Sequence, residues 1–187
     1  MKRVVIIGSG NLAEALARAV AKSGLELVQI FARNAERARI IAELTATDWA
    51  THPGMLAQDA DIYLIAVSDK AVEHVAATLP IPEGAAVAHT AGSVPLAAIP
   101  EKFARRAVFY PMQTFTKGRE VDFSVIPVFL ETPSAELRPE LEAFARQLSG
   151  TVIWATSEPG APRGGFRLQL RQPHVCHRRT HRARCRD

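Results

Sequence analysis

The sequence predicts an α/β fold built on a mostly parallel, doubly wound sheet. Over residues 1–158, short apolar runs alternate with helix-like segments, which is the pattern of strands joined by helices. The first run, Val4–Ile7, ends in glycine and leads directly into the Ala- and Leu-rich segment Leu12–Lys22. A strand, a glycine turn and a helix in this order are typical of the first unit of such a sheet.

The remaining elements continue this alternation. The second strand is expected at Leu25–Phe31 and the second helix at Ala35–Leu44. A fully apolar strand is expected at Ile62–Val67, and Asp69 can cap a helix that runs to about Leu79. Further strands are expected at Ala85–His89, Ala107–Tyr110, Val125–Leu130 and Val152–Trp154, and a last helix at Arg138–Leu148.

The composition changes abruptly near residue 159. The whole chain has 23 Lys and Arg against 19 Asp and Glu, a formal net charge of +4. From Gly160 onward there are 8 Arg and one acidic residue, which leaves 15 basic and 18 acidic residues before that point. We therefore predict a folded domain at residues 1–158 and a basic, disordered tail at residues 159–187.

The turn after the first strand has the spacing Gly-x-Gly-x-x-Ala. Gly8 permits a sharp turn, Gly10 lets the backbone approach a diphosphate, and Ala13 allows close packing of helix on strand. The helix N-terminus adds free N–H groups and the positive end of its dipole. We predict a Rossmann-type, dinucleotide-binding domain, the alternative being a tight turn without a ligand. The predicted cofactor residues here are Gly8, Ser9, Gly10, Asn11, Leu12 and Ala13.

The end of the second strand indicates which dinucleotide is bound. It reads Phe31-Ala32-Arg33-Asn34, without the Asp or Glu that holds the ribose hydroxyls in NAD enzymes. A guanidinium can instead pair with the 2′-phosphate of NADP. We predict NADP, with NAD less favoured, and place Arg33 on the 2′-phosphate, where Arg37 can join it. The alternative is that Arg33 is a solvated surface residue.

The chain resembles a known family in four stretches: GSGNLA at Gly8–Ala13, ADIYLIAVSDKAV at Ala60–Val72, HTAGSVP at His89–Pro95 and YPMQTF at Tyr110–Phe115. They are similar to bacterial Rossmann-like proteins that join an NADP-binding domain to a helical domain of unknown function. Those proteins are relatives of pyrroline-5-carboxylate reductase and of the deazaflavin-dependent NADP reductases. The resemblance implies an oxidoreductase whose helical domain helps to close the site and to form a homodimer.

These stretches place polar residues at the carboxyl edge of the sheet, where open α/β sheets bind their ligands. His89 is predicted to be catalytic, because an imidazole can transfer protons near neutrality. The alternative is a strand-end histidine whose hydrogen bonds are made by backbone. His52 and His74 are interpreted as ordinary surface residues. Further cofactor contacts are predicted at Ala66, Val67 and Ser68, and substrate contacts at Ser93, Tyr110 and Gln113.

The resemblance stops near residues 157–159, where the relatives continue into a long apolar helix. Residues 161–178 can be back-translated with permitted codons so that skipping one base yields HLAAVFVCNFANHMYAI, the kind of helix expected there. We therefore expect that residues 160–187 are translated out of frame and that the helical domain of the family is missing.

Two functional interpretations of the tail are less favoured. Its thiols and imidazoles have the chemistry of zinc ligands, but their spacing matches no common zinc module, so no metal site is predicted. Its arginines can contact phosphates, but they lack interleaved aromatic residues, so no nucleic-acid partner is predicted. The candidate zinc ligands would be Cys176, His177, His181 and Cys185.

Together these features predict an oxidoreductase that transfers hydride between NADP(H) and an unidentified small carbonyl or imine substrate. Without the helical domain we expect this chain to be inactive, because closure of such sites commonly needs a second domain. The alternative is a non-catalytic dinucleotide-binding or sensor module. No apolar run approaches the roughly 20 residues of a membrane span, and no secretory signal begins the chain. We therefore expect no membrane partner and a cytoplasmic location.

Overall fold

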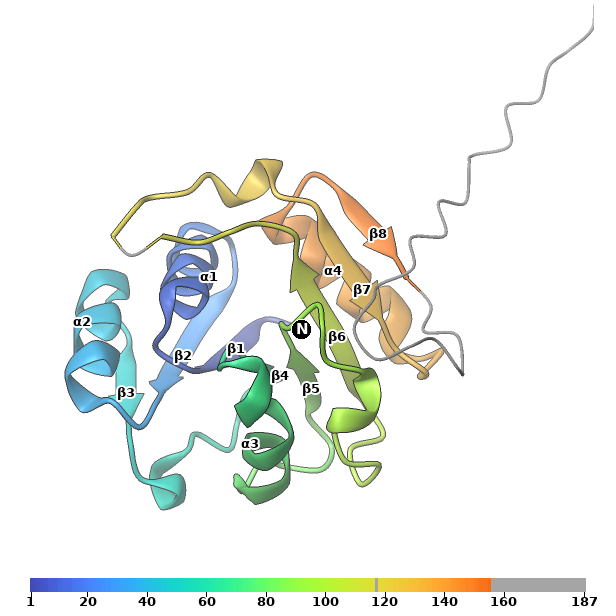
Figure 1. Ribbon diagram of the computed structural model, residues 1–187, viewed down its shortest axis with the longest axis horizontal. Coiled ribbons are helices and arrows are strands. Elements are labelled where there is room, and N and C mark those ends of the chain that lie inside the picture. Colours follow the sequence, from blue (N-terminus) through green and yellow to red (C-terminus); the bar gives the residue numbers. More distant parts are fainter. Residues whose placement is uncertain (117, 156–187) are drawn as a thin grey trace, which may run out of the picture.

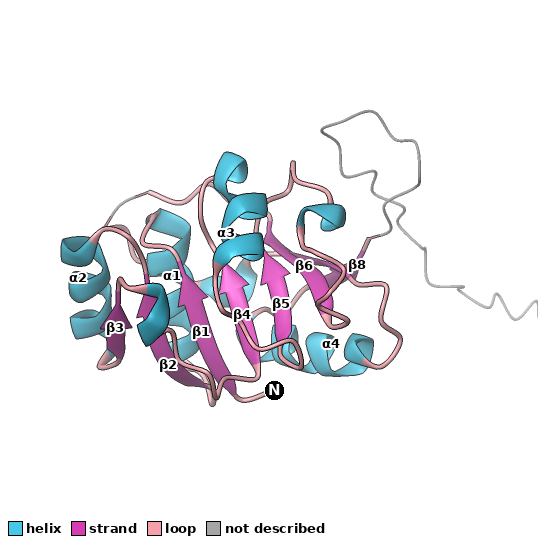
Figure 2. Cartoon of the chain, turned by 90° about the horizontal axis from the view of Figure 1, so that it is seen from below, coloured by secondary structure: helices cyan, strands magenta, loops and turns pink. Residues whose placement is uncertain are grey.

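The computed structural model describes residues 1–116 and 118–155, and these form an eight-stranded sheet with helices on both faces (Figures 1 and 2). The strand order is β3-β2-β1-β4-β5-β6-β7-β8. The strands are β1 (Arg3–Ile7), β2 (Glu26–Phe31), β3 (Asp48–Ala50), β4 (Ile62–Ile65), β5 (Ala86–His89), β6 (Arg106–Pro111), β7 (Val128–Glu131) and β8 (Val152–Trp154). The α-helices are α1 (Asn11–Lys22), α2 (Ala35–Thr45), α3 (Val72–Thr78) and α4 (Leu137–Leu148).

The strand directions confirm the predicted α/β fold with a mostly parallel, doubly wound sheet. Strands β1 to β6 are all parallel, β7 is antiparallel to β6, and β8 is parallel to β7. The chain order reverses direction across the sheet between β1 and β4. In open α/β sheets a ligand crevice forms at such a reversal, outside the carboxyl ends of the strands.

Two apolar cores lie on opposite faces of the sheet. Val4 and Ile6 of β1 pack in the core that includes α1, α2 and α4, whereas Val5 and Ile7 pack in the core that includes α3. Successive side chains of a strand point to opposite faces, so a strand covered on both sides is apolar throughout. This burial explains the continuous apolar run that marks β1 in the sequence.

The structure differs from the predicted elements mainly where tertiary contacts create or shorten a strand. β3 was not predicted, because two of its three residues are exposed and it lacks the wholly apolar run that marks β8. The expected strand at Val125–Leu130 begins at Val128, because Phe123–Val125 forms a 3₁₀ turn, η4. β8 and α4 lie where they were predicted, apart from one residue at the start of α4.

Among residues 1–116 and 118–155, no helix combines the length and the apolar character that crossing a bilayer requires. The predicted domain boundary at residue 158, the basic tail, its out-of-frame interpretation and its candidate zinc ligands all lie outside the described residues. They stay predictions.

Candidate functional site

A cavity of about 720 Å³ opens at the carboxyl ends of β1, β2 and β4. Its walls are the glycine turn, the loops that follow β2 and β4, and one side of α3. Nine of the predicted cofactor residues line it: Gly8, Ser9, Gly10, Asn11, Leu12, Arg33, Ala66, Val67 and Ser68. Ala13 does not line the cavity, because it is fully buried in the core beneath α1. Its small side chain therefore serves helix–sheet packing.

The two glycines of the turn are glycines for different structural reasons. Gly8 has a φ of +139°, and a Cβ added there would lie 2.1 Å from the backbone oxygen of Ala66. Gly10 has a φ of −77°, which any residue adopts, and a Cβ there would meet no protein atom within 4 Å. The fold therefore requires Gly8, whereas at Gly10 the missing side chain leaves space open to the cavity.

The N-terminus of α1 forms the floor of the cavity at this turn. Its N-cap is Gly10, and no side chain caps the first turn. Uncapped N–H groups at a helix start can bind an anion, which the helix dipole also favours. The side-chain amide of Asn11 donates a hydrogen bond to the backbone oxygen of Phe115 at 3.0 Å, so it ties the turn to the loop after β6. The residues present thus fit the diphosphate of a dinucleotide.

Arg37 does not join Arg33 at the cavity, which corrects the prediction. Its guanidinium lies 2.9 Å from the carboxylate of Glu14, and its Nε donates to the backbone oxygen of Ser9 at 3.4 Å. Arg18 pairs with the same carboxylate at 3.1 Å. Arg37 is thus held beneath the turn by a buried acid of α1 and supports the turn from behind.

The environment of Glu14 keeps its carboxyl group ionised. Burial raises its pKa, but hydrogen bonds from Arg37 and Arg18 and their positive charges outweigh burial, so the pKa lies below the ordinary value of 4.5. The side chain of Glu14 is 8% exposed, and those of Arg37 and Arg18 are 20% and 28% exposed. This cluster holds α1, α2 and the turn together.

We expect Glu14→Gln to lower the free energy of unfolding by about 2 kcal/mol at neutral pH, because two half-buried arginines lose their anion. Because the folded-state pKa of Glu14 is depressed, its stabilisation is present above pH 4.5 and is lost as the pH falls through the folded-state pKa. Urea unfolding of wild type and variant should therefore converge in acid.

Glu43→Gln is the matched control for Glu14→Gln. Glu43 also pairs with an arginine one helical turn away, Arg39, but both side chains are more than half exposed. Exposed pairs of this kind contribute about 0.5 kcal/mol or less. Equal losses in the two variants would contradict a special role for the buried cluster.

The ionisable groups that line the cavity are Arg33 and His74, and no described Asp or Glu lines it. His74, interpreted from the sequence as an ordinary surface residue, is exposed, and it also lines the cavity from α3. His52 does not line the cavity, and its Nδ1 accepts a hydrogen bond from the backbone N–H of Gly54 at 3.2 Å. The sequence did not identify eleven lining residues: Ile7, Phe31, Ala32, Asn34, Thr51, Pro53, Ala71, His74, Val75, Thr78 and Leu79.

His89 ends β5 and is completely buried. Burial lowers its pKa to about 4, although the backbone of Pro95, the charge of Asp69 and the backbone of Ala91 each favour the protonated form. Nδ1 accepts a hydrogen bond from the N–H of Ala91 at 3.4 Å, and Nε2 has no hydrogen-bond partner among the described residues. His89 is therefore neutral near pH 7, and this pKa is too low for the predicted proton transfer near neutrality.

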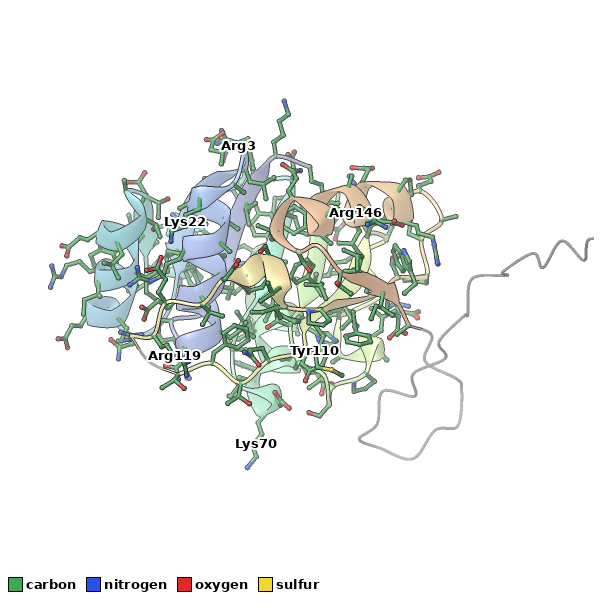
Figure 3. The ribbon with its side chains drawn as sticks, turned by 90° about the horizontal axis from the view of Figure 1, so that it is seen from above. Arg3, Lys22, Lys70, Tyr110, Arg119 and Arg146 are labelled. Carbon is green, nitrogen blue, oxygen red and sulfur yellow. The ribbon has the colours of Figure 1, made fainter. Side chains whose placement is uncertain are left out.

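Asp69 is not a helix cap, which corrects a second prediction. Ser68 is the N-cap of the 3₁₀ turn η2 (Asp69–Ala71), and α3 starts after it without a side-chain cap. The carboxylate of Asp69 instead accepts a hydrogen bond from the hydroxyl of Ser93. This contact joins the loop after β4 to the loop after β5. Lys70, the neighbouring cation in the sequence, points away from the body of the protein (Figure 3).

The predicted substrate residues come from β6 and from the loops after β5 and β6, and they do not line the cavity. Ser93 follows β5, Tyr110 is the last residue but one of β6, and Gln113 follows that strand. The ring of Tyr110 lies against Gly92, where an added Cβ would be 2.6 Å from Cζ. Gln113 is exposed, and its backbone N–H donates to Pro111 at 2.9 Å. Their role in binding substrate stays a prediction.

Comparison with known proteins agrees with this geometry. Residues 3–91 match the family described as NADP oxidoreductase, coenzyme F420-dependent. Among solved structures, a Bacteroides fragilis protein named for a proposed NADP oxidoreductase activity is similar, with 37% identity and a TM-score of 0.77. The match covers 82% of this chain and 60% of that protein. The chain therefore spans about three-fifths of this relative's length. No curated protein matches the chain.

More distant structures share the fold alone. Prephenate dehydrogenase from Aquifex aeolicus has a TM-score of 0.71 at 14% identity, over 82% of this chain and 61% of that one. A pyrroline-5-carboxylate reductase from Coxiella burnetii has a TM-score of 0.59 at 17% identity, over 83% and 59%. The family match and the Bacteroides fragilis structure confirm the predicted resemblance to Rossmann-like proteins of the NADP oxidoreductase kind, and the distant structures agree with the fold.

Proposed function

Because residues 3–91 match a family described as NADP oxidoreductase, we propose that this chain binds NADP(H) in the cavity at the carboxyl edge of its sheet. The observation that carries the proposal is the cavity wall, which combines an uncapped helix start, Arg33 and no described carboxylate. A dinucleotide has an anionic linker, and NADP adds a 2′-phosphate that a nearby carboxylate would repel. NAD is the less favoured cofactor for the same reason.

In the proposed complex, each wall of the cavity has one task. Backbone N–H groups of the glycine turn bind the diphosphate, Arg33 binds the 2′-phosphate, and Ala66–Ser68 lie along the ribose and nicotinamide. Bound NADPH supplies a hydride for a small carbonyl or imine substrate. Ser93, Tyr110 and Gln113 orient that substrate. The Nδ1 of neutral His89 accepts a hydrogen bond from the backbone N–H of Ala91 and so holds the loop that carries Ser93.

We propose a substrate of small size, no nucleic-acid or membrane partner, and a cytoplasmic location. The homodimer and the helical domain that the family resemblance implies, and the expected lack of turnover in this chain, stay predictions.

Arg33→Ala tests the cofactor. We expect it to weaken NADPH binding by about 10- to 100-fold, because a charge-assisted hydrogen bond contributes about 1.5–3 kcal/mol. NADH, which lacks the 2′-phosphate, should bind almost as it does to the wild type. Titration with each coenzyme, followed by nucleotide fluorescence or calorimetry, measures both dissociation constants.

The matched control for Arg33→Ala is Arg39→Ala. Arg39 is an exposed arginine of α2 that pairs with Glu43 and does not line the cavity. It should leave both affinities unchanged. Tighter binding of NADH than NADPH to the wild type would contradict the proposed cofactor, as would an equal loss for both coenzymes in Arg33→Ala.

A second candidate function is dinucleotide binding without turnover. It is favoured by His89, which is completely buried and, with a pKa of about 4, is not in the acidic imidazolium form near neutrality. NADPH oxidation measured with a panel of keto acids and cyclic imines distinguishes the two functions. Saturable NADPH binding with no oxidation by any acceptor would support the second one.

A further inference from the structure

The connection between β6 and β7 runs across α1 and is held to both ends of that helix (Figure 1). At the first residue of α1, Nδ2 of Asn11 donates a hydrogen bond to the backbone oxygen of Phe115 at 3.0 Å. At the last residue of α1, the ammonium group of Lys22 pairs with the carboxylate of Glu120. Asn11 lines the proposed dinucleotide cavity, whereas Lys22 and Glu120 do not. The first contact therefore joins the cavity to the loop after β6.

Phe115 is held by its ring as well as by its backbone oxygen. The ring stacks on that of Phe123, with the ring centroids 6.2 Å apart and the planes at 20°. Phe123 is buried in the core that includes α1 and α4, and Phe115 is half-buried against the same core. Residues 112–114 and Thr116, on either side of Phe115, are exposed. Phe115 thus anchors the exposed stretch 112–116, and Asn11 adds a tie from this stretch to the glycine turn.

The backbone of Asn11 belongs to the part of α1 that the diphosphate would contact. Asn11 is the first residue of the helix, and the first intrahelical hydrogen bond runs from the N–H of Glu14 to the oxygen of Gly10 at 3.0 Å. The N–H of Asn11 precedes that bond, so it is one of the helix-start donors that an anion can use. A bound diphosphate would hold the backbone of Asn11 in place and, with it, the direction in which the side chain leaves toward Phe115.

The side-chain amide of Asn11 has two N–H hydrogens to give, and the loop uses one of them. A backbone oxygen can only accept, so the contact with Phe115 commits one amide hydrogen to the loop. That hydrogen is not available to a phosphate oxygen. Truncation of the side chain should therefore release the loop and leave the backbone N–H groups of the turn in place. The same truncation would weaken ligand binding strongly if the amide held the ligand itself.

We infer that Asn11 is a positioning residue that couples dinucleotide binding at the glycine turn to the loop at residues 112–116. The inference rests on the proposed binding of NADP(H) and gives the Asn11 side chain a task beyond contact with the cofactor. A ligand that orders the turn favours docking of the loop, and because coupling is reciprocal, the docked loop favours the ligand. The loop carries Gln113, so bound coenzyme would order a residue that is proposed to orient the substrate.

The experiment compares wild type, Asn11→Ala and the control Glu120→Gln in the full chain, each with and without saturating NADPH. Chymotrypsin cleavage after Phe115, identified by mass spectrometry, measures how often the loop opens, and titration measures NADPH affinity. We expect NADPH to slow cleavage of the wild type about fivefold, a modest coupling between sites. Glu120→Gln breaks the tie at the other end of α1, so it should keep this protection.

Asn11→Ala should differ from both proteins. Without NADPH, its cleavage after Phe115 should be about fivefold faster than in the wild type, the effect of one lost hydrogen bond. Saturating NADPH should leave that rate unchanged, because the tie between turn and loop is gone. Reciprocity limits the loss of NADPH affinity to the same coupling factor, about fivefold. A residue that only stabilised the loop would change the first rate and not its dependence on NADPH.

Three results would overturn the inference. One is wild-type protein that binds NADPH and is cleaved after Phe115 equally fast with and without it. Another is NADPH-dependent protection that persists in Asn11→Ala, with thermal unfolding showing that the variant is folded. The third is a loss of NADPH affinity in Asn11→Ala far above fivefold, because that would place the amide on the ligand itself. Wild-type protein that binds neither NADPH nor NADH would refute the proposed function, and this inference with it.

Discussion

Gly10→Ala is expected to weaken NADPH binding at least 100-fold while leaving the protein folded. A Cβ at residue 10 would meet no protein atom within 4 Å, so the fold has room for it. The same Cβ would project into the cavity at the start of α1, where the diphosphate must approach the backbone closely. Losing that approach removes several hydrogen bonds to a charged group, each worth about 1.5–3 kcal/mol. Titration with NADPH, together with thermal unfolding, measures both effects.

Gly84→Ala is the matched control for this prediction. Gly84 also has no protein atom within 4 Å of an added Cβ, but it lies in the turn before β5 and does not line the cavity. It should bind NADPH as the wild type does. The N-cap position of Gly10 makes alanine slightly less favourable there, so a small loss of stability is expected, below about 1 kcal/mol. Wild-type affinity in Gly10→Ala would mean that the diphosphate does not lie on this turn.

Gly8→Ala is expected to prevent stable folding, with a loss of about 4 kcal/mol or more in the free energy of unfolding. The φ of +139° is one that residues with a Cβ rarely adopt, and the added Cβ would lie 2.1 Å from the backbone oxygen of Ala66. That oxygen cannot move freely, because the N–H of Ala66 donates to Ile7 at 2.7 Å and continues the pairing of β1 with β4. Relief of the clash would therefore separate the two central strands.

Circular dichroism and urea unfolding of Gly8→Ala measure this effect, and Gly10→Ala is its natural comparison. The two substitutions add the same methyl group two residues apart, so their contrast separates the needs of the fold from those of the ligand. A Gly8→Ala protein that unfolds within a few degrees of the wild type would contradict the close approach of β1 to β4 at this position.

Much of the fold could be predicted because its signals are local. The apolar run of β1, the glycine turn and the Ala- and Leu-rich α1 are adjacent in the chain, and each element has its own period. The nine cofactor residues that line the cavity were predicted for the same reason, because each lies in the loop after a strand or at the start of the helix that follows it. β3 was missed because Asp48 and Trp49 are exposed and no apolar run marks the strand, which is defined by its pairing with β2.

The errors at the site have a different origin. Arg37 pairs with Glu14, 23 residues away in the chain, and Asp69 accepts a hydrogen bond from Ser93, 24 residues away. No local sequence pattern indicates either partner. His89 was expected to exchange a proton near neutrality, but the pKa of an imidazole depends on the water around it, and burial removes that water.

The sequence by itself determined the order of elements, the parallel sheet, the glycine turn and the presence of Arg33 where a carboxylate usually stands. These follow from side-chain periodicity and from the few residues that a sharp turn permits, both of which act over neighbouring residues. Only the tertiary structure decided that Arg37 supports the turn from behind, that His89 is neutral and that His74 faces the cavity. Charge pairing, desolvation and exposure to a cavity depend on which distant segments meet, and the packing of the sheet brings those segments together.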